Sequence, residues 1–287
     1  MSFDKRKFGF VALLGGPNVG KSTLINQIVG TKVSIVTPKV QTTRRLLVGI
    51  VTHGSCQMAF MDTPGIFRPK RPRDRKMVAA AWGGVDYADI ISVVIDARVG
   101  IDPNSRMIIK NLENCQRQGI CILNKIDIVQ RPKLLQLTEE LSKTNVFTEF
   151  FMISALKGDG VEDLSRFLIQ KLPRGEWRFP EDQLSDINDQ LFAAEITREK
   201  LFINLHQELP YAIGVETETW EAFNDGSLKI EQVVYVEKNN YKGILIGKNG
   251  ERIKRVRIMA QKELQVLLGQ KVHLYLFIKV RENTEEI

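Results

Sequence analysis

Residues 15–22 read GGPNVGKS and match the pattern G-x-x-x-x-G-K-S, with Gly15, Gly20, Lys21 and Ser22 in register. Glycines let consecutive backbone N–H groups turn toward one anion, and a helix that begins after the loop adds further unpaired N–H groups. A lysine here can reach the β- and γ-phosphates of a nucleotide, and a serine can ligate Mg²⁺. The spacing predicts a phosphate-binding loop. The alternative is a glycine-rich turn between a strand and a helix that binds nothing.

The motif DTPG at 62–65 follows an apolar run and adds contacts for a nucleotide bound with magnesium. Asp62 can hold Mg²⁺ through a water molecule, because carboxylate oxygens are preferred magnesium ligands. The N–H group of Gly65 can contact the γ-phosphate. We therefore expect the motif to distinguish a triphosphate from a diphosphate.

The motif NKID at 124–127 indicates which base is bound. Asp127 can accept hydrogen bonds from guanine N1–H and N2–H₂, which adenine lacks. A buried acceptor left unpaired can reject the wrong base by roughly 10⁴-fold. We expect Asn124 to brace the loop and the Lys125 stem to lie over the base. The motif SAL at 154–156 can give a backbone N–H to guanine O6. Together the motifs predict GTP or GDP.

Two polar stretches are expected to respond to the nucleotide. The first, TPKVQTTRRLL at 37–47, contains Thr42 and Thr43, and either could contact Mg²⁺ and the γ-phosphate in the GTP state alone. The second, FRPKRPRDRKM at 67–77, has six basic residues and one acidic residue. It could contact RNA, lie as a solvated loop or touch anionic lipid, and we favour RNA.

Short apolar runs rich in β-branched residues alternate with segments of helical spacing over the first 172 residues. This alternation predicts a mostly parallel sheet covered by helices on both faces, with ligands at the carboxyl ends of its strands. Two of the runs, separated by THGSC, predict an antiparallel hairpin at one edge. The predicted strands are 8–14, 46–51, 57–61, 90–96, 120–123 and 150–153, and the predicted helices are 20–30, 103–118, 132–143 and 161–172.

Prolines, a glycine and mixed charges interrupt this rhythm at 172–185 and predict a linker. The segments after it predict the order α-β-β-α-α-β, which is a complete small α+β domain. The predicted elements are a helix at 188–207, strands at 211–219 and 229–237, a helix–turn–helix at 241–268 and a strand at 271–280. We therefore divide the chain into domains at 1–175 and 187–287, joined by a linker at 176–186.

The tetrapeptide GKNG at 247–250 lies between an apolar helical segment and a basic one. Two glycines without side chains would let an RNA backbone approach the loop closely. Lys248 adds positive charge, and neighbouring isoleucines could form a groove wall for bases or be ordinary core residues. The candidate RNA contacts are Ile246, Gly247, Lys248, Asn249, Gly250, Ile253, Lys254 and Arg257.

Charge and composition narrow the functional classes further. The chain of 287 residues has a net charge of +7, distributed as +9 over 1–183, −8 over 184–237, +9 over 238–281 and −3 over 282–287. This distribution suggests that part of the C-terminal domain meets a polyanion, although solubility alone could explain it. Three cysteines and three histidines are too few for a disulfide framework or a zinc site. No apolar run is long enough for a membrane span, and the N-terminus lacks a signal-peptide core.

The quoted motifs together, PNVGKST, QTTRR, DTPG, NKID and SAL, resemble those of the Era GTPases. The resemblance covers the whole chain, because Era proteins also carry a C-terminal KH RNA-binding domain. It implies an α/β P-loop GTPase domain followed by a smaller α+β KH domain of type II. It also implies a GTP-hydrolysing switch that binds small-subunit ribosomal RNA near its 3′ end and assists assembly of the small ribosomal subunit.

The expected cofactors are GTP or GDP and Mg²⁺, and K⁺ is a further candidate. We expect a cytoplasmic monomer, and peripheral contact with the inner face of the cell membrane stays open. The expected catalytic residues are Lys21, Thr42, Thr43 and Gly65, and the expected metal ligands are Ser22, Thr43 and Asp62. The expected nucleotide-binding residues are Gly15, Asn18, Val19, Gly20, Lys21, Ser22, Thr23, Asp62, Gly65, Asn124, Lys125, Asp127, Ser154, Ala155 and Leu156.

Two positions bear on the rate of hydrolysis. Ile66 follows DTPG where Ras-like enzymes have a water-orienting glutamine, so we expect slow intrinsic turnover, with water positioned by backbone, another switch residue or a partner. Asn18 resembles the asparagine of GTPases that place K⁺ beside the phosphates, and it could equally stabilise the loop turn. Other hypotheses are a GTPase whose C-terminal domain binds a protein or membrane partner, a P-loop kinase, which NKID argues against, and a scaffold without hydrolysis.

Overall fold

The computed structural model describes residues 6–37, 46–67, 69, 72–205 and 213–281, and for 72–74, 76, 77 and 80 it describes the backbone alone. The chain forms two compact units. Unit 1 contains nearly all of the chain up to Asp186, and unit 2 contains Ile187–Ile287. Each unit is described by itself below.

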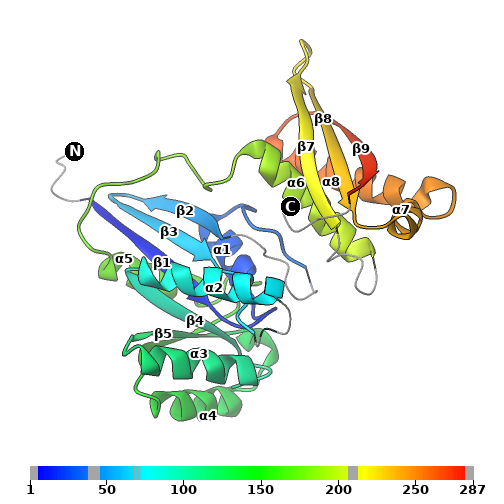
Figure 1. Cartoon of the computed structure of the whole chain (residues 1–287). Helices are drawn as coiled ribbons and strands as arrows, with labels where there is room; N and C mark the ends of the chain where they lie inside the picture. Colours follow the sequence, from blue (N-terminus) through cyan, green and yellow to red (C-terminus); the bar gives the residue numbers. More distant parts are fainter. Residues whose placement is uncertain (1–5, 38–45, 68, 70–71, 206–212, 282–287) are drawn as a thin grey trace. The chain divides into compact units, whose positions relative to one another are not determined.

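Unit 1 is built on a six-stranded sheet with the order β2-β3-β1-β4-β5-β6 (Figure 1). Every neighbouring pair is parallel except β2 and β3, which are antiparallel from Leu47↔Asp62 to His53↔Cys56. The predicted antiparallel edge is therefore confirmed. The strands are β1 (Lys7–Leu14), β2 (Leu47–His53), β3 (Cys56–Asp62), β4 (Ile90–Asp96), β5 (Gly119–Asn124) and β6 (Phe147–Ile153).

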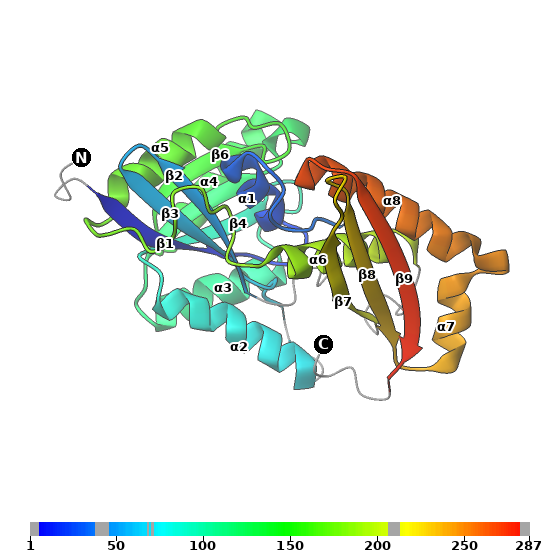
Figure 2. The ribbon, with the colours of Figure 1, turned by 90° about the horizontal axis from the view of Figure 1, so that it is seen from above.

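Helices cover both faces of this sheet, and in Figure 2 α1 and α5 lie on the opposite side from α2 and α3. The core under α1 and α5 includes Leu24 and Leu164, and the core under the other helices includes Ile108 and Leu137. Strands buried on both faces need continuous apolar runs, which explains why the runs do not alternate with polar residues. The helices are α1 (Lys21–Val29), α2 (Pro72–Asp86), α3 (Pro103–Asn114), α4 (Arg131–Ser142) and α5 (Val161–Lys171).

Helix α2 was not predicted, because the sequence analysis assigned its first turns to a polar switch segment. Its first residues are basic and prolyl, and Gly83 and Gly84 have low helix propensity. Tertiary packing compensates, since Ala81 and Val85 are buried beside Ile91 in the core of unit 1. The local pattern was therefore too weak to show a helix that the core requires.

The segment predicted as a linker, 176–186, packs along the edge of unit 1. The buried Gln57 side chain accepts hydrogen bonds from the N–H groups of Arg178 and Phe179 at 3.2 and 3.1 Å, and it donates to Phe179 O at 2.9 Å. Ile50 N–H donates to Leu184 O at 2.8 Å. These contacts cover the outer edge of β2, which would otherwise present unpaired backbone groups.

Unit 2 contains a three-stranded sheet of order β7-β8-β9, in which β7 and β8 are antiparallel and β8 and β9 are parallel. Its elements follow the predicted order α-β-β-α-α-β. They are α6 (Asp189–Asn204), β7 (Ile213–Ala222), β8 (Leu228–Val236), α7 (Asn239–Ile246), α8 (Glu251–Leu268) and β9 (Val272–Val280). The core includes Leu201, Val234 and Val256. Among the described helices, none has the length and apolar character that a membrane span requires.

Candidate nucleotide and RNA sites

The phosphate loop joins β1 to α1 at the carboxyl end of the sheet. Gly20 has a φ of +103°, and a Cβ atom there would lie 2.2 Å from Asn124 Nδ2. A Cβ atom at Gly15 would lie 2.6 Å from Val94 O. Both glycines of the motif are therefore required by close approach of the surrounding chain, and Gly20 also by its left-handed backbone.

Lys21 is a buried ammonium, 7% exposed, within this loop. Its Nζ donates to Gly15 O and Gly16 O, each at 3.2 Å. Burial lowers the pKa of Lys21 from 10.5 to about 8, and the charge of Asp62 partly opposes this shift. A phosphate bound in the loop would stabilise the charged ammonium more strongly than the two carbonyls do.

Asp62 ends β3 and is fully buried. Its Oδ2 accepts hydrogen bonds from Ser22 Oγ and from Ser34 Oγ, each at 2.7 Å. The next residue, Thr63, donates to Leu13 O at 2.6 Å, which fixes the start of the DTPG segment against β1. A carboxylate and a serine hydroxyl in contact are the kind of oxygen ligands that Mg²⁺ takes, so these residues fit a magnesium site.

The rest of DTPG packs directly on the phosphate loop. A Cβ atom at Gly65 would lie 3.0 Å from the backbone of Pro17. Ile66 N–H donates to Gly15 O at 3.0 Å, and the Ile66 side chain is fully buried beside Ala81. The side chain of Ile66 therefore points into the core rather than toward a nucleotide. Thr42 and Thr43 lie outside the described residues.

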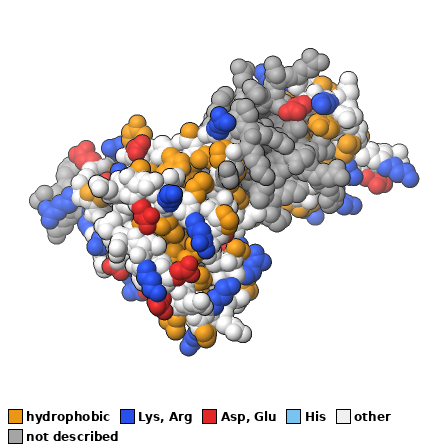
Figure 3. Space-filling view, turned by 60° about the horizontal axis from the view of Figure 1, so that its bottom comes forward, with side chains coloured by type: hydrophobic (Ala, Val, Ile, Leu, Met, Phe, Trp, Pro, Cys, Tyr) orange, Lys and Arg blue, Asp and Glu red, His pale blue; other side chains and the backbone are white. Residues whose placement is uncertain are grey.

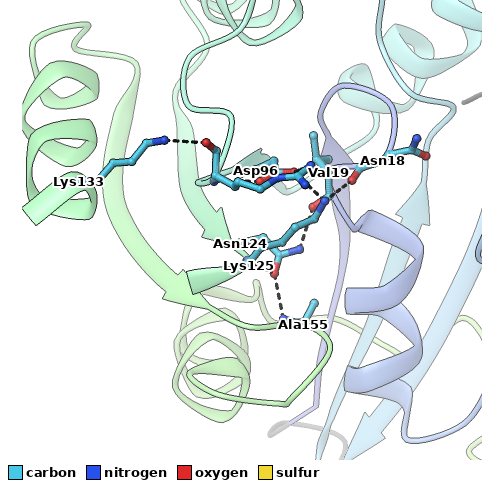
Figure 4. Close-up of polar contacts among 8 residues, drawn as sticks. Asn18, Val19, Asp96, Asn124, Lys125, Lys133 and Ala155 are labelled. Carbon is cyan, nitrogen blue, oxygen red and sulfur yellow. Dashed lines mark hydrogen bonds and ion pairs between the residues drawn. The ribbon is translucent and has the colours of Figure 1, made fainter. Parts of the chain in front are cut away.

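Asn124, at the end of β5, connects three of the predicted motifs (Figure 4). Its Nδ2 donates to Val19 O in the phosphate loop at 2.8 Å. Its Oδ1 accepts from Ala155 N–H at 2.9 Å and from Lys125 N–H at 2.8 Å. The bracing role expected for Asn124 thus corresponds to specific bonds between segments 31 and 105 residues apart in the chain.

Lys125 extends from the NKID motif to the phosphate loop. Its Nζ donates to Asn18 O and to Asp96 Oδ2, both at 2.7 Å (Figure 4). Both Lys125 and Asn18 have positive φ values, 67° and 60°. Sequence reasoning missed Asp96, although its place as the last residue of β4, at the same sheet edge as the motifs, was a usable signal.

Several polar groups of the residues expected to bind guanine already interact with other groups of the protein. The carboxylate of Asp127 is 3.8 Å from Lys157 Nζ, and its side chain is 11% exposed. Ser154 and Ala155 donate their N–H groups to Asp159 O and Asn124 Oδ1. Leu156 is 78% exposed. A base bound here would find Asp127 as a largely buried acceptor.

In unit 2 the predicted GKNG loop turns between α7 and α8. Gly247, Asn249 and Gly250 have φ values of 72°, 51° and 75°, all in the left-handed region. A Cβ atom at Gly247 would lie 2.8 Å from Arg252 Cβ, whereas one at Gly250 would meet nothing within 4 Å. Lys248 and Asn249 are exposed. The loop therefore presents backbone and positive charge to solvent.

Not all of the predicted RNA contacts face outward. Lys254 is exposed and Ile246 is half-buried, but Ile253 packs against the core of unit 2. Arg257 donates to Gln261 Oε1 at 3.0 Å and to Leu274 O at 3.4 Å, so its guanidinium is directed at β9. Sequence reasoning missed Arg252, which donates to Ile244 O near the end of α7.

Figure 3 shows one face of the molecule, on which lysine and arginine side chains are interspersed with aspartate and glutamate rather than gathered in one patch. In unit 2, Lys248 of the GKNG loop and Lys254 and Arg255 of α8 are exposed basic residues.

Two family models match the chain. A model described as 50S ribosome-binding GTPase matches residues 10–125, and a model described as KH domain matches residues 208–285. The GTPase Era of Brucella suis is 54% identical over 275 residues, covering 96% of this chain and 88% of that protein. The GTPase Era of Rhizobium meliloti is also 54% identical, with the same coverage of both chains.

Two solved structures are similar over nearly the whole chain. One is Era in complex with MgGDPNP and nucleotides 1506–1542 of 16S ribosomal RNA, with a TM-score of 0.91, 38% identity and coverage of 97% of this chain and 95% of that one. The other is an Era variant from Aquifex aeolicus bound to GDP and AlF₄⁻, with a TM-score of 0.90, 38% identity and coverage of 96% and 95%.

Proposed function

Because this chain belongs to the Era family of GTPases, we propose that it couples GTP binding and hydrolysis to contact with small-subunit ribosomal RNA near its 3′ end, and so assists assembly of that subunit. The chain is a GTPase that uses GTP or GDP with Mg²⁺. The hydrogen bonds of Asn124 are the main structural support for this site, because its side chain connects the phosphate loop with the NKID and SAL segments. The relative solved with 16S ribosomal RNA supports the choice of RNA.

Each residue of the nucleotide site has its own proposed role. Lys21 would move its ammonium from the loop carbonyls to the β- and γ-phosphates, and Ser22 and Asp62 would hold Mg²⁺. Bound Mg²⁺ would neutralise phosphate charge during transfer to water. Gly65 N–H would donate to the γ-phosphate, and Thr42 or Thr43 would respond to its presence. Asp127 would accept the two guanine donors and so exclude ATP.

We propose slow intrinsic turnover, which the buried position of Ile66 supports. Because this side chain cannot orient water, single-turnover hydrolysis by the protein alone should be slower than about 1 per second. A rate of several per second that is unchanged in Ile66→Gln would contradict the proposal. We also propose that K⁺ binds beside Asn18 and stabilises transition-state charge, and equal rates in KCl and NaCl would remove K⁺ from the mechanism.

The GKNG loop is proposed as the RNA contact, with Gly247, Lys248, Asn249 and Gly250 at the backbone and Lys254 as a nearby charge. Ile246 would form part of the groove wall. Ile253 and Arg257 would act indirectly, because Ile253 packs against the core of unit 2 and the Arg257 guanidinium is directed at β9. A KH module reads single-stranded RNA, whose unstacked bases are accessible.

The test compares Gly250→Asp with Gly269→Asp. Both glycines have left-handed backbones, with φ of 75° and 63°, and neither would place a Cβ atom within 4 Å of a neighbour. Both substitutions therefore add one negative charge at a left-handed position without a close neighbour, but Gly250 is the N-cap of α8 in the loop and Gly269 is the C-cap at the other end of the helix. RNA from the 3′ end of the small-subunit rRNA and a scrambled RNA are titrated with protein in the GDP state and with a nonhydrolysable GTP analogue.

We expect sequence-dependent binding that favours the GTP state and is lost in Gly250→Asp but retained in Gly269→Asp. Binding that is weak and indifferent to nucleotide and to both substitutions would instead favour a protein or membrane partner for unit 2. We further propose that the protein is a cytoplasmic monomer, and sedimentation with and without anionic vesicles tests its mass and its peripheral membrane contact.

A further inference from the structure

Ser34 lies outside every motif of the sequence, yet its hydroxyl contacts Asp62, the proposed magnesium ligand. Ser34 Oγ donates to Asp62 Oδ2 at 2.7 Å, the same oxygen that accepts from Ser22 Oγ at 2.7 Å. Ser34 is 2% exposed and Asp62 is fully buried. The two hydroxyls approach Asp62 from opposite ends of α1. Ser22 lies in the first turn of this helix, and Ser34 lies five residues after its last residue, Val29.

The backbone around Ser34 is fixed by one side chain of α1. Asn26 Oδ1 accepts hydrogen bonds from Val33 N–H and Ser34 N–H, each at 2.9 Å, and Asn26 Nδ2 donates to Ser34 O at 2.8 Å. Three bonds from a helical residue leave Ser34 little freedom to move relative to Ser22. Its hydroxyl is therefore a preorganised donor, directed at the carboxylate before any ligand arrives.

We infer that Ser34 is a positioning residue for magnesium: its hydroxyl orients the Asp62 carboxylate, so that Ser22 and Asp62 form a competent Mg²⁺ site. Partners that orient a metal ligand typically change metal affinity by about 10- to 100-fold when removed. The inference rests on the magnesium–nucleotide site and adds a residue to it.

The experiment measures release of a fluorescent GDP analogue as MgCl₂ is titrated, in the full-length protein. Ser34→Ala should raise the Mg²⁺ concentration needed to slow release by about 10-fold. GDP affinity in excess EDTA should match that of the wild type. Ser34→Thr, which keeps the hydroxyl, should restore most of the Mg²⁺ response. The control is Ser92→Ala, a buried serine of β4 whose Oγ has no partner among the described residues, and it should behave as wild type.

Three outcomes would overturn the inference. An unchanged Mg²⁺ midpoint in Ser34→Ala would show that Asp62 is positioned without it. An equal loss of GDP affinity with and without Mg²⁺ would assign Ser34 to packing of the loop instead. A wild-type protein whose GDP release does not respond to Mg²⁺ would remove the magnesium site itself, and that result is distinguishable because it appears before any substitution.

Discussion

At the scale of single residues, the nucleotide site contains a buried charge that lowers the stability of the protein when no ligand is bound. Lys21 is an ammonium buried among backbone carbonyls. Desolvation disfavours its charged form, and the pKa near 8 expresses that cost. Buried charged groups with shifted pKa values are common at functional sites, where a bound ligand of opposite charge stabilises them. The site is thus prepared for an anion at the expense of stability in the free protein.

We predict that Lys21→Met is more stable than wild type at pH 7 without nucleotide, by on the order of 1–3 kcal/mol. The unfolded state keeps its lysine proton up to a pKa of 10.5, whereas the folded state releases it near 8. Between these values the unfolded state binds more protons, so wild-type stability rises with pH and the difference shrinks. Urea unfolding at pH 7 and pH 10 tests this, and a less stable Lys21→Met at pH 7 would contradict it.

At the scale of elements, α2 shows how packing overrides weak local preference. Its apolar contacts come from Ala81, Val85 and the half-buried Trp82, while Gly83 is exposed within the helix. Glycine in an exposed helix interior costs about 1 kcal/mol relative to alanine. A helix with this composition depends on the core beneath it for its stability.

We predict that Gly83→Ala raises the free energy of unfolding by about 0.5–1 kcal/mol, because a Cβ atom there meets nothing within 4 Å and the backbone is helical. Gly54→Ala is the matched control. It is equally open but has a φ of +58°, so the same change should destabilise the protein. Denaturant unfolding measures both. Effects of the same sign in the two variants would show that backbone conformation does not decide the outcome.

At the scale of the whole molecule, the chain between the two units is anchored to unit 1 rather than free. Gln57 binds its backbone at Arg178 and Phe179, and Val48 N–H donates to Asp186 Oδ1 at 2.9 Å. Arg178 also lies over the rings of Phe8 and Phe10, each at 5.4 Å. Contacts with unit 1 therefore continue along this segment as far as Asp186.

We predict that Gln57→Ala releases this segment. The substitution leaves the N–H groups of Arg178 and Phe179 without their acceptor, so hydrogen exchange across 178–186 and tryptic cleavage after Arg178 should both increase several-fold. Gln118→Ala is the control, since its exposed Nε2 donates to Asn145 O away from the segment. Unchanged exchange in Gln57→Ala would show that the β2 contacts at Ile50 and Val48 are sufficient.

Local residue patterns were enough to predict the nucleotide class, GTP or GDP with Mg²⁺, and the order of nearly all elements. Motifs such as Gly15–Ser22 and Asp62–Gly65 depend on spacing within a few residues, because a loop's backbone conformation is set locally. Apolar runs of strand length likewise identify buried strands without knowledge of their neighbours. The GKNG loop was predictable for the same reason, as a pair of glycines between two helical segments.

Tertiary packing brings further side chains into contact with these motifs, and local patterns did not predict which ones. Ser34 reaches Asp62, Asp96 reaches Lys125, and Gln57 reaches Phe179 across sequence separations of 28, 29 and 122 residues. It also turned Ile253 and Arg257 inward and formed α2 from a weak pattern. The physical reason is that the direction and partners of a side chain depend on how distant elements pack, and a local pattern of residue types does not encode that packing.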